Sequence, residues 1–112
     1  MVRRLKERME PGFDGYAVNY RDMDTAHHHL AKYRSFDEAM NAYEELDALS
    51  DRYMEGDIDV EDYHIAVDDI ITDAIDIEYE INFRQIGRDG VWESPYGGVY
   101  KVVNPVAVDL YF

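Results

Sequence analysis

The sequence predicts a single α+β domain, and three observations carry this prediction. Apolar residues recur at helical spacing through residues 36–74, they alternate with polar residues over 77–83, and short apolar runs separated by Gly and Pro follow to the end of the chain. Helices that come before a group of strands are typical of the α+β class. A chain of 112 residues has room for one domain with one core, so we expect residues 1–112 to form a single domain.

The N-terminal part predicts a basic arm followed by one strand. Residues 1–8 carry four bases against one acid, and a Pro-Gly pair follows, so we expect an arm over residues 1–12. The stretch 15–20 alternates as a strand does. Asp22, Asp24 and Thr25 then offer caps for a short helix that runs through Tyr33.

Two amphipathic helices are predicted next. Ser35 and Glu38 form a capping box, an apolar stripe runs from Phe36 to Tyr53, and Gly56 supplies the stop. The second helix begins after an aspartate at position 57 or 59, and its apolar stripe runs through Val60–Ala74. Both helices carry their acidic residues on the outer face.

The remainder of the chain predicts an antiparallel meander on which the two helices pack. Ile77, Tyr79, Ile81 and Phe83 alternate with polar residues, so we expect these four side chains on one buried face. Turns rich in Gly separate the segments that follow. We expect a hairpin turn at 87–90, a strand at 91–93, a second turn at 94–98, and strands at 99–103 and 106–112.

Aromatic residues crowd this C-terminal part and suggest a second contact surface. We expect Trp92 to complete the core, and Tyr96, in a Pro-Tyr-Gly-Gly turn, to lie outside and contact a partner. The chain ends on a predicted strand with no cover evident from the sequence. A homodimer through that edge is therefore a further expectation left open.

The charge is extreme and unevenly placed. The chain carries 25 acids against 11 bases, a net charge of −14, and residues 37–80 hold 17 acids with Arg52 as the single base. Such a field repels nucleic acid and anionic membranes and attracts basic surfaces. We therefore expect neither nucleic acid nor membrane as a direct partner. The chain has no apolar run of ten residues and no cysteine, which favours a cytoplasmic protein without a transmembrane helix, disulfides or thiolate metal sites.

The motifs that suggest a metal site do not meet the geometry that a metal needs. Asp57–Glu61 starts like a calcium loop, but Asp62 and Asp68 occupy the positions that need glycine and a bidentate glutamate. Three consecutive histidines, His27–His29, diverge on a helix and alternate on a strand. Asp24 with His27 or His28 offers two ligands at most. The ExxH spacing of Glu61–His64 is typical of di-iron bundles, which need it twice, so we expect no metal and no cofactor.

Catalytic motifs are missing as well. The sequence holds no glycine-framed serine and no phosphate-binding glycine loop, so it predicts no catalytic residue. Asp68 and Asp69 are one pair that could serve a metal-dependent enzyme. They are adjacent on a helix, about 100° apart, and need not converge. A metal-dependent enzyme that uses helix carboxylates is therefore only an alternative.

The acidic face itself is the candidate site. Carboxylates three or four residues apart on a helix lie about 5–6 Å apart and repel one another, so their concentration calls for a reason. Each would accept hydrogen bonds from arginine or lysine of a partner. The predicted partner-binding carboxylates are Glu44, Glu45, Asp51, Glu55, Asp62, Asp68, Asp69, Asp73 and Asp76.

In these properties the chain resembles the small acidic proteins that phages use against host defence, the DNA-mimicking anti-restriction and anti-CRISPR proteins. The likeness covers the whole chain in size, lack of cysteine, acidity, lack of catalytic motifs, and acids set on helices before a hairpin. It is a likeness in kind and carries no residue roles across. It implies a non-catalytic inhibitor that occupies the basic nucleic-acid groove of a nuclease or CRISPR effector in the host cytoplasm.

Two alternatives to nucleic-acid mimicry stay open. A small domain adapted to high salt would show the same bias towards aspartate, with 15 aspartates and only three lysines. An adaptor that binds another class of protein would also carry such a face. The crowding of charge into residues 37–80 favours a surface meant for a partner, because adaptation to salt would spread acids over the molecule.

Overall fold

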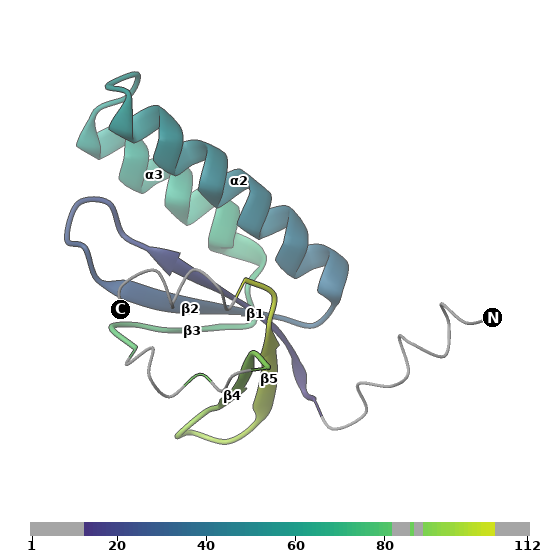
Figure 1. Cartoon of the computed structure of the whole chain (residues 1–112). Coiled ribbons are helices and arrows are strands. Elements are labelled where there is room, and N and C mark those ends of the chain that lie inside the picture. The colour runs from purple at the N-terminus through teal and green to yellow at the C-terminus, as the bar shows by residue number, and fades with distance from the viewer. Residues whose placement is uncertain (1–12, 82–85, 87–88, 105–112) are drawn as a thin grey trace.

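The computed structural model describes residues 13–81, 86 and 89–104, which form a five-stranded sheet with two long helices on one face (Figure 1). The expected α+β class is confirmed. The expected arm at 1–12 and last strand at 106–112 lie outside the described residues. In chain order the elements are β1 (Gly15–Arg21), β2 (His28–Tyr33), α2 (Phe36–Met54), α3 (Val60–Ile70), the 3-10 helix η1 (Ile71–Asp73), β3 (Asp76–Glu78), β4 (Val91–Glu93) and β5 (Val99–Val102).

The strands lie in the order β3-β2-β1-β5-β4. β1 is antiparallel to β2, β2 to β3 and β4 to β5, whereas β1 and β5 are parallel. The expected meander is therefore wrong in its pairing, because β3 pairs with β2 and the β4–β5 hairpin joins the other side of β1. Pairing follows the apolar faces that meet in the folded chain, and strands adjacent in sequence need not be neighbours in the sheet.

The segment after β1 is a turn and a strand, where the sequence predicted a short helix through Tyr33. The Asp22 carboxylate accepts hydrogen bonds from the amides of Asp24 (2.8 Å) and Thr25 (3.2 Å), so these residues cap a turn. Every residue of His29–Tyr33 is buried. Burial on both faces suits an inner strand of a sheet that is covered on both sides, and this is what β2 is.

The two predicted helices and their caps are confirmed. The Ser35 hydroxyl accepts from the amide of Glu38 at 3.2 Å, and Asp59 caps α3 by accepting from the amide of Asp62 at 2.8 Å. Phe36 departs from the expected buried stripe of α2 and Val60 from that of α3, since they are 51% and 41% exposed. The residues of the two helices that are buried against the sheet are Ala39, Ala42, Leu46, Leu49, Tyr63 and Val67.

The sheet buries apolar side chains on both faces. On the helix side, Val18 and Tyr20 of β1 belong to the main core together with the buried residues of α2 and α3. On the opposite face a smaller cluster forms from Ala17, Leu30, Trp92 and Val102. Trp92 is 2% exposed, as expected of a core residue. β1 therefore carries both cores and is the centre of the sheet.

The predicted face of β3 and the residues after it is right only in part. Of the expected buried positions, Ile77 packs against the main core and Ile81 against the smaller cluster, but Tyr79 is 64% exposed and Glu78 is only 8% exposed. Pairing with β2 sets Glu78 opposite Leu30, on the face that carries the smaller cluster. Phe83 lies outside the described residues. The register of β3 with β2 decides that Glu78 is buried, and this register cannot be read from the sequence of β3 alone.

A buried ion pair occupies that face. Lys32, 2% exposed, contacts the carboxylate of Glu78 at 2.5 Å and that of Asp76 at 3.1 Å. The Glu78 carboxylate also accepts from the hydroxyl of Ser94 (2.7 Å) and from the indole N–H of Trp92 (3.3 Å). The Lys32 ammonium and the Oε2 atom of Glu78 thus each have several polar partners, which a buried charge requires.

Candidate binding surface

All nine predicted carboxylates are exposed in the structure. α2 carries three of them and its C-cap residue Glu55 is a fourth, α3 carries three, and one lies in η1 and one in β3. Glu44, Asp51 and Glu55 follow one outer line of α2, because steps of seven and four residues return to the same face. At 1.5 Å per residue they span about 16 Å along the helix. Packing of the opposite face of α2 on the sheet holds these carboxylates in place.

The structure brings Glu45 and Asp73 together in one pocket. Its volume is about 170 Å³, and Glu38, Asn41 and Tyr33 also line it. Glu38, Asn41 and Glu45 project from one face of α2 because they lie three, four and seven residues apart. η1 then places Asp73 beside them. We call this the Tyr33 pocket, and its remaining lining residues are Ala42 and Ile70.

Asp76 and Tyr96 meet in a second, larger hollow. Both line an open groove of about 630 Å³ along β3, an edge strand of the sheet among the described residues. Tyr96 is 86% exposed, as expected for a residue of a glycine-rich turn. Asp76 differs from the other predicted carboxylates because it already pairs with Lys32. A cation of the partner would therefore have to share the Asp76 carboxylate with Lys32.

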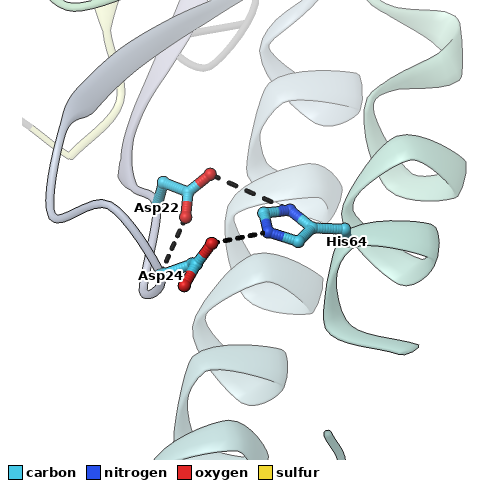
Figure 2. Close-up of side chains that lie close together, drawn as sticks. All are labelled: Asp22, Asp24 and His64. Carbon is cyan, nitrogen blue, oxygen red and sulfur yellow. Dashed lines mark hydrogen bonds and ion pairs between the residues drawn. The ribbon is translucent and has the colours of Figure 1, made fainter. Parts of the chain in front are cut away.

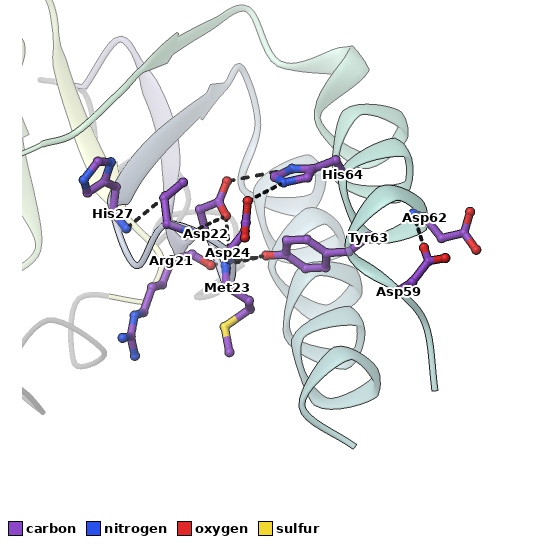
Figure 3. Close-up of polar contacts among 10 residues, drawn as sticks. Arg21, Asp22, Met23, Asp24, His27, Asp59, Asp62, Tyr63 and His64 are labelled. Carbon is purple, nitrogen blue, oxygen red and sulfur yellow. Dashed lines mark hydrogen bonds and ion pairs between the residues drawn. The ribbon is translucent and has the colours of Figure 1, made fainter. Parts of the chain in front are cut away.

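A group that sequence spacing did not reveal lies between the β1–β2 turn and α3 (Figure 2). The Nε2 atom of His64 is 3.2 Å from the Asp24 carboxylate, and its Nδ1 atom is 4.0 Å from that of Asp22. Figure 3 shows what holds the turn there. The Tyr63 hydroxyl accepts from the amide of Met23 at 3.1 Å, beside His64 on the same helix.

This group offers a nitrogen and two carboxylate donors within 4.8 Å of one another, a set that suits zinc or manganese better than calcium. Among the described residues, no other three side chains of the metal-binding types come as close together. These contacts already join the three side chains and tie α3 to the turn. The pairing of Asp24 with His27 or His28 that the sequence suggested does not appear, and His27 lies 3.6 Å from Glu80 instead.

Comparison of the chain with known protein families, curated proteins and solved structures found no match. Neither α2 nor α3 is long and apolar enough to cross a bilayer, and the described residues hold no other helix that is. Because no known protein matches, the geometry and charge of the candidate surface are the only support for a function.

The sequence did not reveal Tyr33 and Glu38 as members of the surface. Glu38 was assigned to the cap of α2, a role it does have, and its place seven residues before Glu45 was the signal for a shared face. Tyr33 carried no such signal. Tyr33 lines the pocket only because β2 packs against α2, which is a tertiary relation.

Proposed function

We propose that this protein is a non-catalytic acidic binding protein that occupies the basic nucleic-acid-binding surface of a host defence nuclease or CRISPR effector by mimicking nucleic acid. The observation that supports it best is the placement of the nine predicted carboxylates. All are exposed on α2, α3 and the segment that follows, and Arg52 is the single base among residues 37–80. A basic groove would meet an array of anions already fixed on packed helices.

Pre-organisation is what distinguishes this face from an acidic tail. Like charges on one helix destabilise it, so the array needs support from elsewhere in the fold. Leu46 and Leu49 of α2 and Val67 of α3 supply it by packing into the main core. A partner would then bind without ordering a flexible chain first, and the affinity lost to ordering would be small.

The test is capture of purified basic nucleases and CRISPR effectors by the immobilised protein. We expect at least one to bind, and nucleic acid that occupies its groove to compete. Affinity should fall steeply, by about tenfold or more, as salt rises from about 50 to about 200 mM, since the contacts are ionic. Thermal unfolding in low salt and in molar potassium chloride runs alongside. A chain that folds only in molar salt and captures nothing would contradict the proposal and favour adaptation to high salt.

A further inference from the structure

The floor of the Tyr33 pocket holds an unsatisfied polar group. Tyr33 is 2% exposed, and its hydroxyl makes no hydrogen bond with any described residue. Burial, followed by the charges of Asp73, Glu45 and Glu38, raises the pKa of Tyr33 to about 12, so the hydroxyl stays protonated and neutral. A buried hydroxyl without a partner is unfavourable, and native proteins rarely leave one. Tyr33 lines the pocket, and the charges of Asp73, Glu45 and Glu38, which line it too, act on its hydroxyl.

The walls of the pocket are anionic and lack a counter-ion. Glu38, Glu45 and Asp73 are exposed at its rim, and no basic side chain of the described residues lies within ion-pair distance of them. Glu38 accepts a hydrogen bond from the Ser35 hydroxyl at 3.1 Å through one carboxylate oxygen, which leaves the other oxygen available. Three carboxylates around a protonated phenol form a site for a cation.

Size and spacing favour an organic cation over a metal ion. A volume of about 170 Å³ equals roughly five or six waters at about 30 Å³ each. The carboxylates of this pocket also lack the close approach of ligand atoms that Asp22, Asp24 and His64 reach. Ala42 and Ile70 give the pocket apolar wall as well, which suits an aliphatic stem behind a charged head.

We propose that the Tyr33 pocket receives the guanidinium group of an arginine side chain from a protein partner. The guanidinium is planar and carries five N–H donors, and the pocket offers acceptor oxygens on Tyr33, Asn41 and three carboxylates. The ammonium of lysine has three donors and acts as a point charge, so it would leave more of these acceptors unpaired. The inference rests on the proposed function, since a basic partner has to present the arginine.

The test needs no partner, because a small probe replaces it. N-acetyl-arginine amide is titrated into the ¹⁵N-labelled full chain, with the lysine and citrulline analogues as comparison ligands, and amide shifts are followed by NMR. We expect saturable shifts centred on Tyr33, Asn41 and Asp73 with arginine, weaker binding of lysine, and none of citrulline. Glu45→Gln should weaken arginine binding about tenfold by removing a charge-assisted hydrogen bond.

Asp47→Asn is the matched control, because it removes the same charge from an exposed position of α2 outside the pocket. Tyr33→Phe should also weaken arginine binding while unfolding at the same or higher urea concentration, since it deletes an unpaired buried hydroxyl. Equal weakening by Glu45→Gln and Asp47→Asn, or shifts spread over both helices, would overturn the inference and indicate diffuse attraction. Absence of saturable shifts would also overturn it.

The two proposals fail separately. If the protein captures a basic partner but the arginine probe does not bind the pocket, the pocket inference fails and the proposed function stands. If the probe binds and Glu45→Gln releases it, while no nuclease or effector is captured, the pocket stands and the proposed function fails.

Discussion

Replacing Lys32 by methionine is expected to destabilise the fold by about 3–5 kcal/mol, because it leaves the buried carboxylate of Glu78 without its cation. Lys32 is 2% exposed and Glu78 8%, so water would solvate the unpaired carboxylate only poorly. The hydrogen bonds from Ser94 and Trp92 would remain, but they do not neutralise the charge. Urea unfolding of the variant and the wild type at neutral pH measures the difference.

A double variant separates the charge from the packing. Lys32→Met with Glu78→Leu removes both charges and keeps similar volume, and we expect it to recover most of the lost stability. Replacement of buried ion pairs by apolar residues is often neutral or stabilising. If the double variant were as unstable as Lys32→Met alone, the pair would not be the source of the loss.

The pH dependence of the same pair has a defined sign. Burial opposes the charge of Glu78, but hydrogen bonds from Lys32, Ser94 and Trp92 outweigh it and hold the pKa of Glu78 below its ordinary value of 4.5. Stability from this group is therefore present above about 4.5 and is lost as pH falls through the lowered pKa. In Lys32→Met that carboxylate protonates more easily. The difference in unfolding free energy between Lys32→Met and the wild type should consequently become smaller in acid.

The pKa of Lys32 determines how stability changes at alkaline pH. Burial disfavours the charge of Lys32, but its bonds to Glu78 and Asp76 outweigh burial and raise the pKa of Lys32 above 10.5. The stability that Lys32 contributes is fully present below its ordinary pKa of 10.5 and is lost as pH rises through the raised pKa. Unfolding free energies measured from acid to alkaline pH should thus show a plateau in the wild type that Lys32→Met lacks.

Reversing the charge of Glu44 and Asp51 together is expected to weaken capture of a basic partner about a hundredfold or more, because two attractive contacts become repulsive. Both side chains are exposed on the outer line of α2, so the fold should tolerate lysine at both positions. Lysine at position 51 would lie four residues from both Asp47 and Glu55. It would replace the repulsion that Asp51 has with these two acids by attraction. Affinity is measured by surface capture and folding by thermal unfolding.

The control makes the same charge change elsewhere. Asp89→Lys with Glu93→Lys alters the net charge equally at two exposed positions outside residues 37–80. This variant should bind within a few fold of the wild type, apart from weaker long-range attraction. Equal losses in both variants would mean that total charge, and not the α2 face, drives binding. Unchanged binding by the Glu44 and Asp51 variant would remove α2 from the interface.

Local signals predicted the elements that depend on local chemistry. The capping residues Ser35 and Asp59 start α2 and α3 as expected, because a cap involves backbone groups only three residues away. The acidic residues of the two helices were correctly predicted to be exposed, because the apolar stripes occupy the faces that pack on the sheet. The α+β class followed from the order of periods along the chain.

Strand faces and partners needed the folded chain. The sequence of β3 favoured Tyr79 as buried, yet pairing with β2 buried Glu78 beside Lys32, 46 residues earlier in the chain. The β1–β2 turn was predicted as part of a helix, because its aspartates cap either structure equally well. Side-chain period alone cannot decide register, since a slip of one residue exchanges the two faces.

The amino-acid sequence by itself determined the helices, their caps, the class of fold and an anionic outer face, because each depends on residues within a few turns of one another. The tertiary structure alone decided which strands pair, which carboxylate is buried with Lys32, and which acids share a pocket over Tyr33. These relations join residues from separate elements. Their free energy comes from desolvated charges and packed faces that exist only after those elements have met.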